Sequence, residues 1–280
     1  MQLIKMTGGL GNQMFIYAFY LQMKKRFSDV HIDLSDMVHY HVHHGYEMNR
    51  VFNLPHIEKC YPQSLKKVAE FLFFKTILER KLKDPFNAYK TRPTWPLVYY
   101  KGFYQTEKYF NEVADDIRKA FTFNTTLFTD KNRALEAEIL NNPNAVSLHV
   151  RRGDYLQPKH WNAVGCVCQK EYYNNAIAEI KNRIEAPHFY VFSDDIQWVK
   201  DNFELENVTF IDWNTGNDSW QDMMLMSRCK HNIIANSTFS WWGAWLNPNK
   251  QKIVIAPNRW FANHDAPNII PDGWIKVATN

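Results

Sequence analysis

A short polar segment in the middle of the chain contains residues that could bind a phosphate group. It reads His149-Val-Arg-Arg-Gly-Asp154. Arg151 and Arg152 each carry a planar fork of N–H donors, which matches phosphate oxygens in a way that lysine cannot. Gly153 allows the backbone to turn tightly beside a ligand, and Asp154 could orient an arginine or take a proton from an attacking hydroxyl. A surface pair of arginine and aspartate is the plain alternative.

A second polar segment, Ser193-Asp-Asp195, has side chains that suit the rest of a nucleotide. An aspartate can accept hydrogen bonds from ribose hydroxyls or from the edge of a purine, so Asp194 and Asp195 are both candidates. Serine and aspartate also cap helices, because their oxygens accept hydrogen bonds from the first free backbone amides. The two roles are compatible.

A third polar segment places hydroxyl groups where a helix is expected to begin. The free amides and the dipole of a helix start favour an anion, so this segment predicts a second contact with a diphosphate. The candidate ligands are Asn236, Ser237, Thr238, Phe239 and Ser240. The alternative is a simple helix cap followed by core aromatic residues, and packing against a sheet is the favoured role of Trp241, Trp242 and Trp245.

A glycine loop near the N-terminus follows an expected strand and precedes an expected helix. Its spacing imitates a dinucleotide fingerprint, but Met14 stands where a third small residue is required, so the loop does not indicate NAD binding. Gly9 and Gly11 still permit a close approach of the backbone to a ligand. Asn12 and Gln13 could donate hydrogen bonds to a phosphate or a sugar.

Each of the three polar segments follows a run of apolar residues that reads as a buried strand. Strands and helices alternate in this half of the chain, which predicts a doubly wound parallel α/β sheet. Because such sheets bind ligands at the carboxyl ends of their strands, the three segments should converge on one edge. The expected strands cover 145–150, 188–192, 208–212, 232–235 and 252–256, and the expected helices cover 170–184, 195–202, 218–229 and 238–246.

The first half of the chain begins with the same strand, loop and helix pattern. Its expected elements are strands over 2–6 and 30–34 and helices over 13–26, 64–83, 107–120 and 131–140. The helix over 64–83 is basic, and we interpret its charges as a solvated face, with weak contact to an anionic membrane as the alternative. Pro143 ends the last helical pattern, so the sequence predicts one domain over 1–142 and another over 143–280.

The bulk composition bounds the class of protein. The 280 residues carry 33 Lys+Arg against 29 Asp+Glu, a net charge of +4 that does not by itself indicate nucleic acid as a partner. The aromatic-rich composition excludes a disordered chain and a disulfide miniprotein. We expect a cytoplasmic protein, since no secretory signal or membrane-spanning run is recognised. The oligomeric state is left open.

No metal site or cofactor is predicted. The chain has no Asp-x-Asp pair, which usually holds the metal on a sugar-nucleotide diphosphate, and no phosphate-binding loop of an NTPase. The histidines at 39, 41, 43 and 44 lack carboxylate or thiolate support, and the four cysteines are expected to be reduced thiols. Arginine would therefore neutralise a departing diphosphate, and the residues favour a metal-independent nucleotide-sugar transferase.

Four motifs together resemble those of the bacterial α-1,2-fucosyltransferases, glycosyltransferase family 11. They are Gly8-Gly-Leu-Gly-Asn-Gln-Met-Phe15, His149-Val-Arg-Arg-Gly-Asp154, Phe192-Ser-Asp-Asp195 and Asn236-Ser-Thr-Phe-Ser-Trp-Trp242, in the order of the family and over nearly the whole chain. The resemblance implies a GT-B-like fold with two Rossmann-type domains facing across a cleft. It also implies transfer of fucose from GDP-L-fucose to O-2 of a terminal β-galactoside, with inversion and without a metal.

The resemblance also suggests individual roles. Arg152 would bind the β-phosphate, while Arg151 and His149 order the same loop. Ser237, Thr238 and Ser240 would contact the diphosphate, Asp194 or Asp195 the ribose or guanine, and Asn12 the fucose or its phosphate. Asp154 is the candidate base. The acceptor would be bound by loops over 35–50 and 85–105, where no motif is recognised.

Two alternatives remain open at this point. One is a fucosyltransferase that makes another linkage during the assembly of a surface polysaccharide, because donor-side motifs do not define the acceptor. The other is a noncatalytic protein that binds carbohydrate or nucleotide, with tryptophans as stacking platforms. Intact Arg151, Arg152 and Asp154 argue against that second alternative.

Overall fold

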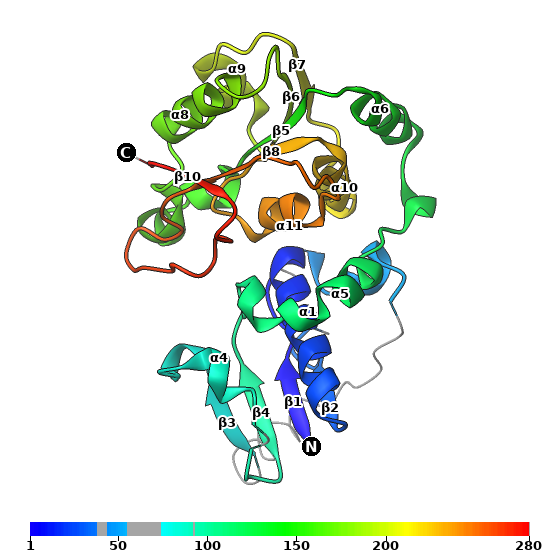
Figure 1. The fold of residues 1–280 in the computed structure, drawn as a ribbon, viewed down its shortest axis with the longest axis vertical. Coiled ribbons are helices and arrows are strands. Elements are labelled where there is room, and N and C mark those ends of the chain that lie inside the picture. The colour runs from blue at the N-terminus through cyan, green and yellow to red at the C-terminus, as the bar shows by residue number, and fades with distance from the viewer. Residues whose placement is uncertain (38–43, 55–73, 92, 280) are drawn as a thin grey trace. The chain divides into compact units, whose positions relative to one another are not determined.

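The computed structural model describes residues 1–37, 44–54, 74–91 and 93–279. They form two compact units, Met1–Asn124 and Thr125–Asn280, each built around its own parallel sheet. Each unit has helices packed on its sheet (Figure 1). The α/β class predicted from the sequence is confirmed for both.

The sheet of the first unit has four parallel strands in the order β2-β1-β4-β3. The strands are β1 (Gln2–Lys5), β2 (Val30–Asp33), β3 (Lys75–Leu78) and β4 (Val98–Lys101). Helix α1 (Leu10–Arg26) follows β1 after the glycine loop, and its last turn is basic, which complements the negative end of the helix dipole. Among the described residues of this unit, the other α-helices are α2 (Met48–Val51), α4 (Pro85–Ala88) and α5 (Ala114–Ala120).

The sheet of the second unit has six parallel strands in the order β10-β9-β8-β5-β6-β7. The chain moves outward from β5 to β7, returns to place β8 on the other side of β5, and moves outward again to β10. This is the doubly wound topology. The strands are β5 (Ala145–Val150), β6 (His188–Ser193), β7 (Val208–Ile211), β8 (His231–Ile233), β9 (Val254–Pro257) and β10 (Ile275–Val277).

Helices cover both faces of this second sheet, as Figure 1 shows. One face packs against α8 and α9, whose Tyr172, Ile177 and Val199 join Leu148 and Val150 of β5 in a hydrophobic core. On the other side α10 packs against α6 and α11. The helices are α6 (Asp130–Asn141), α7 (Pro158–His160), α8 (Lys170–Lys181), α9 (Ile196–Asn202), α10 (Trp220–Arg228) and α11 (Thr238–Leu246).

The tryptophans of α11 are core residues, as the sequence predicted. Trp241 and Trp242 are fully buried and Trp245 nearly so. The ring of Trp241 stacks parallel to that of Trp245, with centroids 6.3 Å apart, and its indole Nε1 donates to the carbonyl of Ile269 at 2.8 Å. These rings stabilise the helix that presents the third polar segment.

The prediction of a helix over 64–83 is wrong where the structure tests it. Residues 55–73 lie outside the described residues, but Lys75–Leu78 forms strand β3 and Glu79–Lys81 a single 3₁₀ turn. Short apolar runs fit a strand as well as a helix, so the pattern in this segment is ambiguous. The parallel pairing of β3 with β4 decides for the strand. The membrane-facing helix suggested by this basic segment therefore has no support between 74 and 83.

The boundary between the units falls before α6, whereas the sequence placed it after that helix, at 142/143. Asn132 of α6 explains this difference. Its buried amide nitrogen donates to Asn214 and to Gln221, both at 2.7 Å, and its oxygen accepts from the indole of Trp213 at 2.8 Å. These bonds fasten α6 to the second unit.

Candidate active site

The three polar segments lie together at the carboxyl edge of the second sheet. Strand β5 lies between β6 and β8, so the residues after Val150, Ser193 and Ile233 leave neighbouring strands at the same edge. The strand order reverses between β5 and β8, and doubly wound sheets bind their ligands at such a reversal. The convergence of the segments is thus confirmed.

Arg151 ties the first two segments to each other. Its Nη2 contacts Asp154 at 2.6 Å and its Nη1 contacts Asp194 at 2.9 Å. Burial opposes the charge on Arg151, but the two carboxylates outweigh burial and raise its pKa above the ordinary value. Asp194 also accepts from the backbone N–H of Arg152 at 2.8 Å. Arg151 therefore orders the loop, and both of its terminal nitrogens are in use.

Arg152 is held differently, through its Nε and one face of its guanidinium. Its Nε contacts Asp195 at 3.1 Å, and its guanidinium carbon lies 3.9 Å from the centre of the Trp198 ring. Within the part of the chain that the structure describes, neither Nη atom has a protein partner. A guanidinium fixed by a carboxylate at one edge and an indole on one face is preorganised to receive two phosphate oxygens.

Gly153 is required by close packing inside this loop. A Cβ atom at this position would lie 2.5 Å from Oδ2 and 3.0 Å from Cγ of Asp194. Asp194 cannot easily move away, because it is bound to Arg151 and to the backbone of Arg152. The glycine therefore serves the approach of two protein segments, whereas the sequence suggested the approach of a ligand.

Asp154, the candidate base, uses one of its two carboxylate oxygens in an ion pair. Oδ1 contacts Arg151, and the side chain keeps 27% of its surface exposed. A carboxylate at this position could accept a proton from an attacking hydroxyl.

His149 is the second-to-last residue of β5, and its side chain is buried on the side of the sheet that faces α11. Its ring is 5.9 Å from that of Phe239, and its Nδ1 has no hydrogen-bond partner among the described residues. Burial and the charge of Arg151 lower the pKa of His149 to about 3. The imidazole is therefore neutral at neutral pH, so it acts as a fixed polar wall of the site.

The buried imidazole predicts a pH-dependent stability. Between pH 3 and 6.5 the unfolded chain binds a proton at His149 that the folded chain does not, so the free energy of unfolding rises with pH in this window. We expect His149→Phe to reduce the difference in unfolding free energy between pH 4.5 and 7 by about 2–3 kcal/mol. Urea unfolding at both pH values measures it, with exposed His264→Phe as control. A full wild-type difference in the His149 variant would contradict the assignment.

The second segment caps a helix and positions Arg152 at the same time. Asp195 accepts from the backbone N–H of Trp198 at 3.1 Å and so caps α9. Ser193 accepts from the backbone N–H of Asp195 at 3.0 Å. The capping interpretation is thus confirmed for Asp195, whose other oxygen holds Arg152.

In the third segment the residues divide into supports and candidate ligands. Asn236 is buried, and its amide donates at 3.0 Å to the carbonyls of Val164 and Trp260. The hydroxyl of Ser240 is also buried and points back to the Ser237 carbonyl. The remaining candidates are Ser237, which caps α11, and the partly exposed Thr238 and Phe239 that follow it.

Sequence reasoning missed Tyr155, which links the first and third segments. Its hydroxyl donates to the Asn236 carbonyl at 3.1 Å, and the Arg151 guanidinium carbon lies 5.7 Å from the centre of its ring. Trp198, the platform of Arg152, was missed as well. The bond from Tyr155 to Asn236 and the contact of Trp198 with Arg152 join residues far apart in the chain, so no local pattern indicates these two contacts. The only signal for Tyr155 itself was the position of an aromatic residue directly after the Arg-Arg-Gly-Asp segment.

The glycine loop lies in the first unit and is tightly built. Gly8 has φ of +82°, and a Cβ there would lie 2.7 Å from Nδ2 of Asn12. The Gln13 amide is fully buried and donates to the carbonyls of Gly8 and Gly45, so it shapes the loop and is not a direct donor ligand. Asn12 is partly exposed and accepts from Gln105 at 2.7 Å.

Gly9 and Gly11 stand at the start of α1. Gly9 is the N-cap, and its carbonyl accepts from the backbone N–H groups of Asn12 and Gln13. Gly11 is buried within the first turn. That these two glycines allow a ligand to approach the backbone closely stays a prediction.

The histidine tract, the cysteines and the apolar runs are the other features that the sequence analysis considered. Among residues that the structure describes, no three His, Cys, Asp or Glu side chains are grouped as metal ligands. The histidines at 39, 41 and 43 and the cysteine at 60 lie outside those residues, and the other three cysteines are free thiols. No described helix is long and apolar enough to cross a bilayer.

Structural similarity supports the GT-B assignment. The fold matches that of an α-1,6-fucosyltransferase, NodZ, soaked with GDP-fucose, with a TM-score of 0.54 and 13% identity over 88% of this chain and 92% of that one. The fucosyltransferase NodZ from Bradyrhizobium gives a TM-score of 0.53 over 86% and 91% of the two chains, also at 13% identity. At this identity the likeness shows the fold alone, which is that of GT-B glycosyltransferases.

Sequence comparison defines the family. An α-1,2-colitosyltransferase of Escherichia coli is 32% identical over 98% of this chain and 97% of its own length. The O-antigen biosynthesis glycosyltransferase WbnK of the same species is 31% identical over 97% and 99%. Human galactoside α-(1,2)-fucosyltransferase 1 is 32% identical over 54% of this chain and 43% of its own. Residues 1–278 match glycosyl transferase family 11, and the chain is a glycosyltransferase that belongs to this family.

Proposed function

We propose that this enzyme transfers L-fucose from GDP-L-fucose to O-2 of a terminal β-galactoside, with inversion at the anomeric carbon. The observation that carries the proposal is the pair of free Nη atoms on Arg152, at the strand edge that also holds Ser237 and Thr238. A fixed guanidinium and the start of α11 supply positive potential for a diphosphate. The family membership supports the type of sugar and the linkage.

The residues of this chain then have distinct tasks. Arg152 neutralises the charge that develops on the β-phosphate as the bond to fucose C1 breaks, so the leaving group needs no proton. Arg151 and Asp194 keep the loop in place. Asp154 accepts the proton of the attacking hydroxyl, which adds to the face of the oxocarbenium-like sugar opposite the departing GDP.

The donor is the first point to test, because one relative is a colitosyltransferase. Colitose lacks the 3-hydroxyl of fucose, so the two donors differ in a single hydrogen-bonding group. We expect a higher kcat/KM with GDP-fucose than with GDP-colitose when lactose is the acceptor. The reverse preference would make the enzyme a colitosyltransferase. Linkage analysis of the product by NMR tests the α-1,2 bond, and a different linkage would support a role elsewhere in polysaccharide assembly.

The sequence also left open a noncatalytic binding protein, and the family membership argues against it. It would bind GDP, which calorimetry measures directly, yet release none from GDP-fucose with any β-galactoside. The intact ion pairs around Arg151 and Arg152 favour catalysis over simple binding, because they fix two cations where charge would develop.

Metal independence gives a separate prediction. Since arginine carries the charge of the leaving diphosphate in this mechanism, we expect the rate of transfer to stay within about twofold of its initial value in excess EDTA. Dialysed enzyme assayed with and without added Mn²⁺ or Mg²⁺ gives the measurement. Collapse of activity in EDTA and rescue by either ion would overturn the metal-free mechanism.

A further inference from the structure

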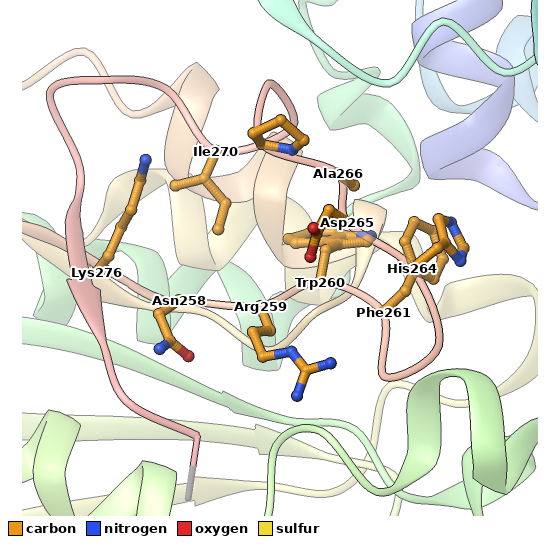
Figure 2. A pocket seen from close by; sticks show the side chains of 10 residues that line it. Asn258, Arg259, Trp260, Phe261, His264, Asp265, Ala266, Ile270 and Lys276 are labelled. Atoms are coloured by element: carbon orange, nitrogen blue, oxygen red, sulfur yellow. The ribbon is translucent and has the colours of Figure 1, made fainter.

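A cavity of about 250 Å³ lies in the second unit, outside the polar segments described above. It is formed by the segment that follows β9 and by Lys276 of β10. Figure 2 shows Lys276 on one side, Trp260 and Asp265 on the other, and Ile270 between them. Strands β8 and β9 are neighbours in the sheet, so this cavity opens at the carboxyl edge next to the start of α11.

The walls of the cavity are held in place by bonds to the site already described. Asn236, which precedes the cap of α11, donates to the carbonyl of Trp260 at 3.0 Å. Trp241 of α11 donates to the carbonyl of Ile269 at 2.8 Å. At the start of the segment the backbone N–H of Asn258 donates to Val277 of β10 at 2.8 Å. The cavity is therefore preformed, which lowers the entropic cost of binding.

The lining combines an apolar floor with a mixed polar rim. Trp260 and Ile270 are buried and give the floor. Arg259, Asp265 and Lys276 are exposed at the rim. The cations donate hydrogen bonds and the carboxylate accepts them, so the rim suits groups that both accept and donate, which are hydroxyls. A sugar ring offers an apolar C–H face and a hydroxyl edge, and this lining matches both.

A phosphate group fits the cavity less well. Segment 258–274, all of it described, contains no helix, so no helix start in this segment faces the cavity. Asp265 would also offset part of the attraction that Arg259 and Lys276 exert on an anion. The diphosphate is better placed at α11, one strand away, where a nine-residue helix begins.

We propose that this cavity is a saccharide subsite for a sugar unit of the acceptor other than the one that receives fucose. The proposal rests on the proposed transferase function and extends it, since the acceptor was expected to be bound by loops of the first unit. The sugar in this subsite contacts the small exposed parts of Trp260 and Ile270 and hydrogen-bonds to the rim. Longer acceptors then bind more tightly than short ones.

The test compares two variants over a series of acceptors. Ala266→Phe fills the cavity while keeping the backbone, and Asp265→Ala removes the acceptor at the rim. Exposed Ala278→Phe and Asp272→Ala are the matched controls outside the cavity. The acceptors are methyl β-galactoside and tri- and tetrasaccharides that end in the same β-galactoside. We expect each cavity variant to raise KM about tenfold for the tetrasaccharide and to leave kcat, the KM of methyl β-galactoside and the Kd of GDP unchanged.

Several results would overturn the subsite. KM changes of equal size for all acceptors, or no change in KM, would mean that no sugar of the acceptor binds in the cavity. A weaker Kd of GDP would place part of the nucleotide there. Saturation-transfer NMR with the tetrasaccharide and no donor separates this proposal from the catalytic one. The signal could be lost in Ala266→Phe while the wild type transfers no fucose to the tetrasaccharide. This outcome would keep the subsite and refute the galactoside acceptor. No signal with the wild type would refute the subsite.

Discussion

Arg152→Ala is expected to lower kcat by on the order of 10²-fold or more, the scale on which a preorganised charge stabiliser acts. The structure explains why this arginine carries the effect. Its Nε and its flat face are fixed by Asp195 and Trp198, while no residue that the structure describes bonds to its Nη atoms. Steady-state kinetics with GDP-fucose and lactose measures the change.

Two further variants make this result specific. Arg183→Ala removes another arginine of the same unit, one paired with Glu179 on the surface, and should leave kcat unchanged. Arg151→Ala should lower both kcat and the melting temperature, because Arg151 cross-links Asp154 and Asp194. Near-normal turnover of Arg152→Ala together with loss in Arg151→Ala at unchanged melting temperature would transfer the phosphate-binding role to Arg151.

Trp241→Ala is expected to lower the free energy of unfolding by about 3–5 kcal/mol, the usual cost of removing a large buried aromatic side chain. The indole is fully buried among Trp242, Trp245 and Trp274, and its Nε1 bonds to the Ile269 carbonyl. Equilibrium unfolding in urea, followed by circular dichroism, measures the loss.

The control for this variant is Trp95→Ala, since the Trp95 side chain keeps 51% of its surface exposed. Exposed substitutions of this kind usually change stability by less than about 0.5 kcal/mol. A loss below about 1 kcal/mol in Trp241→Ala would mean that α11 packs by other contacts. It would also remove the support that Trp241 gives to the wall of the cavity.

Much of the second unit could be predicted from the sequence because its strands are buried on both faces. Ala145–Val150 is apolar except at Ser147 and His149, and all six residues are buried. Turn and capping residues follow directly, as at Ser193 and Ser237. Strand β10 was missed, since Ile275–Val277 is too short to show a pattern.

Local sequence patterns could not predict the division of labour between the two arginines, which only the family resemblance implied. It depends on the register of β5 against β6, which pairs Val150 with Ser193 and so sets Asp194 beside the backbone of Arg152. Residues more than 40 positions apart meet there, and local patterns carry no such information. The same holds for Gln13, whose side-chain amide donates to the carbonyl of Gly45, far from it in the chain.

The attachment of α6 to the second unit has a consequence for exchanging parts between relatives. A chimera joined at 124/125 carries Asn132 together with Gln221 and Asn214, so the buried amides keep their partners. A join at 142/143 brings α6 from one parent and those partners from the other, and any mismatch leaves buried polar groups unpaired. A crossover ahead of α6 therefore keeps the buried polar contacts of the second unit intact in a chimera.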